Sequence, residues 1–163
     1  MTRTVTPLSA PGERVRSLWN RLFHLPGGKT LFSVLFGRMA PYTGSIGARV
    51  DTLEPGFCRV TLRDRRAVRN HLNSIHAMAL ANLAEAASGL AVAAALPAGV
   101  QGIITEFSVT YLKKARGRLV AECRVDLGLV KVEREQEAKV VITDAAGEVV
   151  ARALATWRLR PPA

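Results

Sequence analysis

The fold is decided by residues 70–96, which carry the sequence NHLNSIHAMALANLAEAASGLAVAAAL. This stretch is rich in Ala and Leu, which favour a helix, and we predict one from Ser74, as its N-cap, to about Leu96. The helix is long enough to cross a bilayer, but it contains three polar groups whose insertion into lipid is costly: His76, Asn82 and Glu85. A helix that is apolar on nearly every side must be covered all round, so we expect it in a protein core.

The segments on either side of this helix predict the rest of the fold. Apolar spacing of three and four residues predicts helices at 13–24 and 29–39, and alternation predicts strands at 45–53, 56–62, 102–112, 119–129, 132–143 and 149–159. This order indicates an α+β fold with an antiparallel sheet wrapped around the central helix. We divide the chain into an N-terminal arm and helical extension, residues 1–40, and a main domain, residues 41–163.

Composition and charge limit the function classes. The chain has 163 residues, 48% apolar and 22% charged, with a formal charge of +10, as expected for a globular protein. A basic surface could meet nucleic acid, anionic lipid or a phosphorylated small molecule. The sequence contains no stacking aromatic strip, helix-turn-helix pattern or zinc motif, so we expect no nucleic-acid partner.

The cysteines, the histidines and the N-terminus exclude further classes. Cys58 and Cys123 have no CxxC partner and lie in strand-like runs, so we expect packed, reduced thiols. The three histidines, His24, His71 and His76, form no ligand set with carboxylates, so we expect no metal. No N-terminal segment has the apolar stretch of a signal peptide, and we predict a cytoplasmic protein.

Glu85 is the only formally charged residue between Asn73 and Glu106. A buried carboxylate is costly unless it is paired, so Glu85 is either a catalytic group or a structural carboxylate with an Arg partner. His76 lies nine positions earlier, which places it on the opposite side of the helix and ~13 Å away along the axis. The two residues would therefore meet only between two chains related by a two-fold axis.

The start of the helix offers free backbone N–H groups and the positive end of the helix dipole. The N–H of Ala77 could hold a carbonyl oxygen as it gains charge. The alternative is that the small residues here reflect helix propensity and tight packing.

These residues resemble the hotdog-fold acyl-CoA thioesterase superfamily, in its phenylacetate-pathway-thioesterase-like branch. The resemblance rests on Asn70, on Ser74-Ile75-His76-Ala77, and on Leu83-Ala84-Glu85, with fifteen positions between the Asn and the acid as in the family. Residues 105–112 resemble the family's third strand, and the element order fits over roughly residues 43–160. The family's His-Gly-Gly is here His76-Ala77-Met78, and a polar residue that some members carry on the third strand is the apolar Ile104 or its neighbour.

The resemblance implies a hotdog fold, a dimer or tetramer with sites shared between subunits, and hydrolysis of acyl-CoA or a related thioester without a cofactor. It assigns catalytic roles to four residues: Glu85 activates water or attacks the carbonyl, the Ala77 N–H polarises the carbonyl, His76 positions that turn, and Asn70 orients water or substrate. A non-catalytic acyl-CoA or fatty-acyl binding protein on the same fold is the alternative.

Two further features of the sequence each fit more than one interpretation. Coenzyme A phosphates suit the basic residues near Asn70 and after the third strand, namely Arg66, Arg69, Lys113, Lys114 and Arg116, although solvated loops would look the same. The amphipathic helix at 13–24 could pack on the outer face of the sheet, cap an acyl tunnel or lie on an anionic membrane surface. Of these, we favour packing on the sheet.

Overall fold

The computed structural model of the protein describes residues 11–162. Its helices are α1 (Pro11–Leu22), α2 (Gly28–Met39), α3 (Pro41–Gly44), the 3-10 turn η1 (Arg66–Val68) and α4 (Ala77–Ala95). Its strands are β1 (Arg49–Glu54), β2 (Phe57–Leu62), β3 (Gln101–Tyr111), β4 (Leu119–Arg124), β5 (Arg134–Thr143) and β6 (Val149–Arg160). Residues 1–10 of the N-terminal arm lie outside the described residues, and α1 begins at Pro11, two residues before the predicted start at residue 13.

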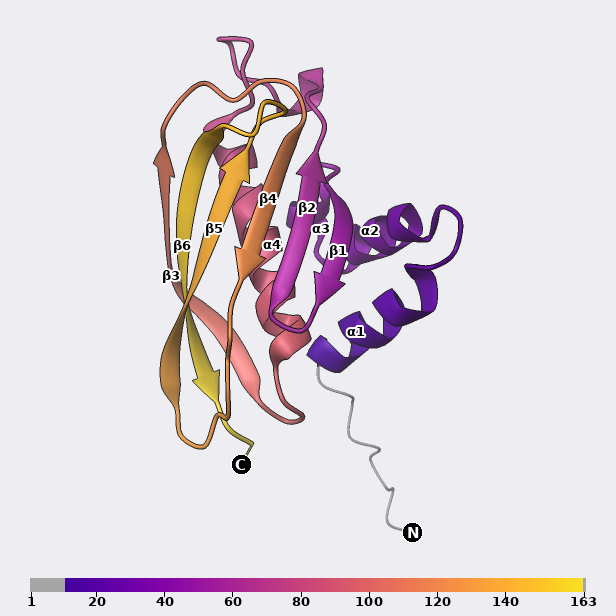
Figure 1. The fold of residues 1–163 in the computed structure, drawn as a ribbon, viewed down its shortest axis with the longest axis vertical. Helices are drawn as coiled ribbons and strands as arrows, with labels where there is room; N and C mark the ends of the chain where they lie inside the picture. The colour runs from indigo at the N-terminus through magenta and orange to yellow at the C-terminus, as the bar shows by residue number, and fades with distance from the viewer. Residues whose placement is uncertain (1–10, 163) are drawn as a thin grey trace.

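The six strands form one antiparallel sheet in the order β1-β2-β4-β5-β6-β3. The sheet curves around α4, which packs against it along most of the helix length (Figure 1). Alternate side chains enter the core, as Leu119, Ala121 and Cys123 do in β4. This is the hotdog fold, and it confirms the predicted architecture of a sheet wrapped around a central helix.

α4 is the core helix. Its length and composition would allow it to cross a membrane, but 72% of its most apolar 18-residue stretch is buried inside the protein. Leu83, Ala87 and Ala91 have no exposed surface at all, because sheet residues cover them. Burial of this helix contributes to the hydrophobic stabilisation of the domain at roughly 25 cal/mol per Å² of apolar surface removed from water.

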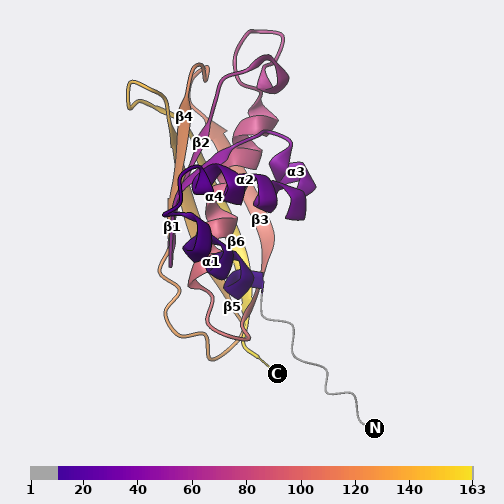
Figure 2. The ribbon, with the colours of Figure 1, turned by 90° about the vertical axis from the view of Figure 1, so that its right-hand side faces the viewer.

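The N-terminal helices share this core. Val15 and Trp19 of α1 are buried, and the Trp19 ring meets the Phe32 ring of α2 edge-on at 5.0 Å. Gly12 permits the contact with α4, since a Cβ there would stand 2.2 Å from the Ala93 carbonyl oxygen. α1 therefore packs against α4, not on the outer face of the sheet as we expected, while α2 packs against β1 (Figure 2).

Several element boundaries differ from the sequence prediction. Pro41, which follows the helix predicted at 29–39, begins a short helix α3 that the sequence did not predict, because proline fits the first helical position. Because α3 occupies residues 41–44, β1 begins at Arg49 and not at the predicted Ser45. β4 ends at Arg124, although buried and exposed side chains continue to alternate beyond it.

The thiols of Cys58 and Cys123 are buried and face each other across β2 and β4. Burial raises the pKa of the Cys123 thiol to about 12, which keeps this sulfur protonated and unreactive. Packed thiols were the sequence prediction for both residues.

Candidate active site

The start of α4 is held by His76. Its Nδ1 accepts a hydrogen bond from the Met78 N–H at 3.0 Å, so the N-cap is His76 and not Ser74, as the sequence suggested. Two backbone bonds fix the cap: Ile75 N–H donates to the Ala115 carbonyl and His76 N–H to the Val68 carbonyl, both at 2.8 Å. An accepting Nδ1 requires the neutral imidazole with its proton on Nε2.

Ala77 is the first residue of α4 and is exposed. Its backbone N–H has no hydrogen-bond acceptor within residues 11–162. The N–H groups of the next two residues do have one: Met78 N–H donates to His76 Nδ1, and Ala79 N–H donates to the His76 carbonyl. The Ala77 N–H is therefore a free donor at the positive end of a nineteen-residue helix.

Asn70 builds the loop that precedes this helix. Its Oδ1 accepts hydrogen bonds from Leu72 N–H at 2.9 Å, Ser74 N–H at 3.2 Å and the Ser74 hydroxyl at 3.1 Å. The turn also needs Asn73 at a φ of 52°, a left-handed conformation that Asn tolerates. The Asn70 Nδ2 group has no partner among the described residues.

A cavity of about 280 Å³ lies beside the start of α4. Asn70 and Ala77 line it together with Tyr111, Lys113 and Lys114, so the fold brings these predicted site residues together. The Tyr111 hydroxyl donates to the Ala77 carbonyl at 3.1 Å and ties the end of β3 to the helix start.

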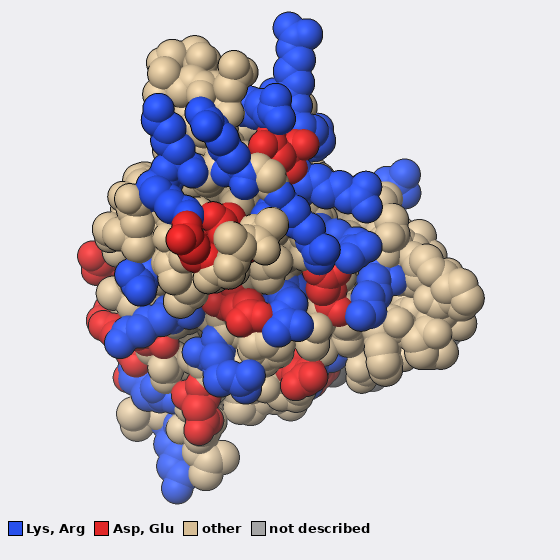
Figure 3. All heavy atoms as spheres, turned by 45° about the horizontal axis from the view of Figure 1, so that its top comes forward, with Lys and Arg blue, Asp and Glu red and all other residues tan. Residues whose placement is uncertain are grey.

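Lys and Arg side chains gather over the upper part of the face that Figure 3 shows, and Lys113 and Lys114 line the cavity. All five residues predicted to meet phosphates are exposed: Arg66, Arg69, Lys113, Lys114 and Arg116. Arg69 is paired with Asp64 at 2.6 Å, and Lys113 is paired with Asp144 at 2.7 Å and with Glu148. Within residues 11–162, no ion pair engages Arg66, Lys114 or Arg116, so these three have guanidinium or ammonium groups available for a ligand.

Glu85 lies in the middle of α4, outside that cavity. Its Oε2 is 3.5 Å from the Thr43 hydroxyl, and burial raises the pKa of the carboxyl group while this hydrogen bond lowers it less strongly. Helix geometry keeps Glu85 ~13 Å along the axis from His76. One chain therefore does not bring the carboxylate to the free N–H of Ala77.

Three residues near Glu85 were not predicted as site residues. Thr43 contacts the carboxylate, Asn82 donates to the Tyr42 carbonyl at 2.9 Å, and the Trp157 ring lies 3.6 Å from where a Cβ on Gly89 would stand. Among the described residues, the buried side-chain atoms without a hydrogen-bond partner are Asn82 Oδ1 and Trp157 Nε1. Asn82 could have been found by its i, i+3 spacing from Glu85, whereas Thr43 and Trp157 are distant in sequence.

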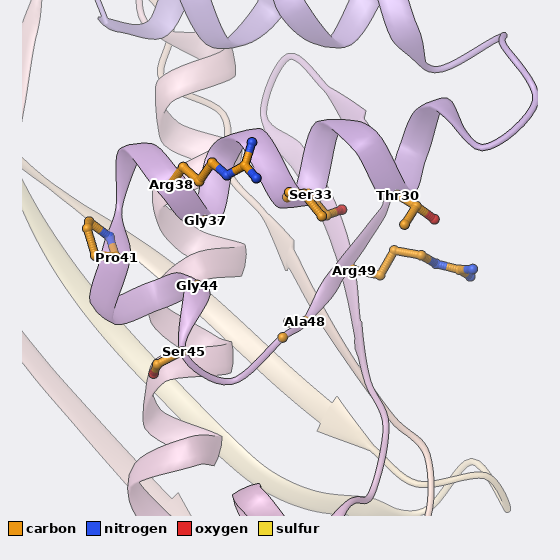
Figure 4. A pocket seen from close by; sticks show the side chains of 11 residues that line it. Thr30, Ser33, Gly37, Arg38, Pro41, Gly44, Ser45, Ala48 and Arg49 are labelled. Atoms are coloured by element: carbon orange, nitrogen blue, oxygen red, sulfur yellow. The ribbon is translucent and has the colours of Figure 1, made fainter.

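A larger cavity of about 640 Å³ lies where α2, α3 and the segment before β1 meet (Figure 4). It contains none of the predicted site residues. Its lining is mostly small, with glycines at 37, 44 and 47, and it includes two arginines, Arg38 and Arg49. The part of the chain that the structure describes holds no group of three His, Cys, Asp or Glu side chains placed to bind a metal.

Comparisons with known proteins agree with this fold. A structural-genomics crystal structure, APC5556, is 31% identical with a TM-score of 0.78, over 93% of this chain and 99% of that one. PA5026 from Pseudomonas aeruginosa, described as a probable thioesterase, is 26% identical with a TM-score of 0.72, over 83% and 96%. A thioesterase family protein from Silicibacter pomeroyi is 22% identical with a TM-score of 0.67, over 81% and 98%.

No curated protein sequence matches the chain. Residues 28–159 match the family model described as Domain of unknown function (DUF4442). This match runs from the start of α2 to Leu159, one residue before the end of β6, and includes every residue of the candidate site. The chain therefore belongs to the DUF4442 family.

Proposed function

We propose that the protein is a thioesterase that hydrolyses acyl-CoA, or a related acyl thioester, to a free carboxylate and a thiol. The observation that carries this proposal is Glu85, a half-buried carboxylate of raised pKa on the core helix of a fold shared with proteins named thioesterases. Carboxylates perturbed by burial are typical of acid–base sites.

The start of α4 would bind the reacting carbonyl. The free N–H of Ala77 would donate to the thioester oxygen, and this bond would strengthen as the oxygen gains negative charge. His76 would hold the turn through its cap. Asn70, whose Nδ2 has no partner among the described residues, would orient the substrate from the same cavity.

Glu85 would act as the base. In this scheme the partner's Glu85 takes a proton from water, the hydroxide oxygen bonds to the carbonyl carbon, and the C–S bond then breaks. The leaving thiolate takes the proton back from the carboxyl group. Direct attack by Glu85, followed by hydrolysis of the anhydride, is the second route that the same placement permits. Neither route needs a cofactor.

A homodimer would complete the site. β3 is an eleven-residue edge strand that pairs with β6 on one side and with no described strand on the other. Long unpaired edges invite pairing with another chain, and a two-fold axis would pair β3 with itself. Ile103, Tyr111 and Met78 expose apolar surface near this edge and near the start of α4. Two such dimers could assemble further into a tetramer.

The oligomer is tested by light scattering coupled to gel filtration. Ile103 is 62% exposed, so Ile103→Glu should leave the monomer folded but dissociate the dimer. Val141→Glu, on the interior strand β5, is the matched control and should stay dimeric. Wild-type protein that runs as a monomer would contradict the shared site.

Coenzyme A is the proposed carrier, as part of the substrate. Its phosphates would meet the basic residues around the 280 Å³ cavity, where guanidinium and ammonium groups bind phosphate well. We expect neither nucleic acid nor a membrane as a partner, since the apolar residues Val15 and Trp19 of α1 are already buried. We place the activity in the cytoplasm, where thiols stay reduced.

The decisive experiment is thiol release from short, long and aromatic acyl-CoAs. Glu85→Gln should lose about 10²–10⁴-fold in kcat with little change in ligand affinity, because the amide cannot accept the proton. Glu54→Gln, an exposed glutamate at the end of β1, is the control and should keep full activity. Binding of acyl-CoA without any release by the wild type would favour the alternative, a non-catalytic acyl-CoA or fatty-acyl binding protein.

A further inference from the structure

We propose that Thr43 is a positioning residue for Glu85, holding Oε2 of the carboxylate so that Oε1 is the oxygen that receives the proton from water. The inference rests on the proposed role of Glu85 as a base. It gives a role in catalysis to α3, an element outside residues 70–85, on which the proposed function is based.

The contact itself is specific. Thr43 Oγ1 lies 3.5 Å from Glu85 Oε2, and within residues 11–162 no other side chain donates a hydrogen bond to this carboxylate. The distance is long for a hydroxyl–carboxylate bond, as is common for catalytic hydrogen bonds in the absence of substrate. Ionisation of Glu85 favours a shorter bond, because bonds to charged acceptors are the strong ones.

α3 is fixed over this face of α4, so Thr43 has a defined position. Asn82 lies one turn before Glu85 on the same side of the helix, and its Nδ2 donates to the Tyr42 carbonyl at 2.9 Å. On the opposite side, Gly37 and Gly44 cross so closely that a Cβ on Gly44 would stand 2.5 Å from the Gly37 carbonyl oxygen. α3 therefore packs directly against α2 and cannot move closer to it without an overlap of the two backbones (Figure 4).

The other carboxylate oxygen faces a different surface. Glu85 Oε1 lies 3.5 Å from where a Cβ on Gly89 would stand, and the same point is 3.6 Å from Cη2 of Trp157. Gly89 has no side chain, so it leaves room beside Oε1, and the indole ring bounds that room with an apolar wall. One oxygen is thus held by a hydroxyl while the other borders space that a glycine keeps open.

Thr43→Val tests the hydroxyl, because valine has nearly the same shape. Without the donor, the ionised form of Glu85 loses its hydrogen bond, so the acid limb of the kcat/KM profile should move up by about 0.5–1 pH unit. Below that limb, the rate should fall about three- to tenfold, since less of the base is ionised. Thr43→Ser keeps the donor and should restore the wild-type profile.

Ser45→Ala is the matched control. The Ser45 hydroxyl donates to the Tyr42 carbonyl at 2.6 Å in the same corner but makes no bond to Glu85. It should leave the acid limb unmoved. An acid limb that shifts equally in Ser45→Ala, or that Thr43→Ser fails to restore, would show that only the shape of the corner matters and would overturn the proposal.

A second readout does not need turnover. Thr43→Val should lower the free energy of unfolding more at pH 8, where Glu85 is ionised, than at pH 4, and this difference should vanish in a Glu85→Gln background. A pH-independent effect in both backgrounds would overturn the proposal even if the enzyme is active. If no thioester is hydrolysed, the proposed function fails, and the same cycle then shows whether Thr43 is coupled to Glu85 as a structural carboxylate only.

Discussion

The carboxylate of Asp64 joins its own loop to Gly117 in the turn after β3. Oδ1 accepts from Arg69 Nε at 2.6 Å and Oδ2 accepts from the Gly117 N–H at 2.8 Å. The two basic segments that flank the 280 Å³ cavity are therefore tied together by one acid between them. Asp64 therefore holds Arg69 and the backbone at Gly117 in fixed positions relative to each other.

Asp64→Asn should loosen this connection. The Arg69 bond holds the pKa of Asp64 below its ordinary value, so the carboxylate stabilises the fold above its unfolded pKa and loses that effect as the pH falls through the folded value. The variant should be less stable than wild type at pH 7 and equally stable near pH 2. In kinetics, KM for acyl-CoA should rise several-fold with little change in kcat.

Denaturant unfolding at several pH values measures the first effect and steady-state kinetics the second. Asp126→Asn is the control, because within residues 11–162 the Asp126 side chain bonds only to the nearby Gly128 N–H. A change in kcat without a change in KM would contradict the view that Asp64 acts on ligand binding through the loops.

Glu85→Gln should stabilise the protein at neutral pH. Burial raises the pKa of Glu85, so the carboxyl group stabilises the fold fully below its unfolded pKa, and this contribution is lost as the pH rises through the folded value. Gln does not ionise, so the melting temperatures of variant and wild type should diverge between pH 5 and pH 8, with the variant higher at pH 8. Each 1 kcal/mol corresponds to roughly 2–4 °C for a chain of this size.

Thermal melts at pH 4, 6 and 8 check this, with Glu54→Gln as the exposed counterpart, whose difference from wild type should not vary in the same way. A Glu85→Gln variant that is less stable at pH 8 would mean that the ionised carboxylate has a favourable partner in the assembled protein.

His76→Ala should remove the helix cap. Nδ1 of His76 accepts the Met78 N–H, and loss of an N-cap acceptor costs about 1 kcal/mol. His76→Asn keeps a side-chain acceptor and should recover most of that stability. Both changes leave the backbone N–H of Ala77 in place. The residual activity of each variant should therefore depend on how well its first turn of α4 stays folded. Urea unfolding together with thiol release at saturating substrate measures both quantities, and equal stability of the two variants would argue against the cap.

The sequence predicted the elements whose signals are local. The central helix follows from its content of Ala and Leu, and the strand after it follows from the alternation of apolar residues, which burial of one face of a sheet imposes. α3 was missed because a proline can end one helix or begin another, and only the close crossing of Gly37 and Gly44 decides between the two. The cap at His76 was assigned to Ser74, because residue statistics do not include the tertiary bonds to Val68 and Ala115 that hold the cap in place.

The candidate site was predictable only in part for the same reason. Glu85 stands out because it is the only charged residue in an apolar helix. Asn70 and His76 precede it at the spacing that resembles the hotdog-fold thioesterases. Thr43 lies 42 positions before Glu85, and no local pattern links the two. Similarly, composition counts charges without their partners, so it could not reveal that Arg69 pairs with Asp64 in its own loop or that Lys113 pairs with Asp144 in another.

The unpaired cations should contribute more to coenzyme A binding than the paired ones. Lys114 and Arg116 have no ion pair within the described residues, whereas Lys113 lies between Asp144 and Glu148. Lys114→Ala and Arg116→Ala should each raise KM for acyl-CoA about three- to tenfold, since a charge-assisted phosphate contact contributes roughly 1 kcal/mol near the surface. KM for the matching acyl-pantetheine, which lacks the phosphates, should not change. Lys139→Ala, on β5, is the control, and raised salt should weaken wild-type binding towards the level of the variants. A loss that is equal for both substrates would place these side chains against the acyl or pantetheine portion, because only the phosphates distinguish the two ligands.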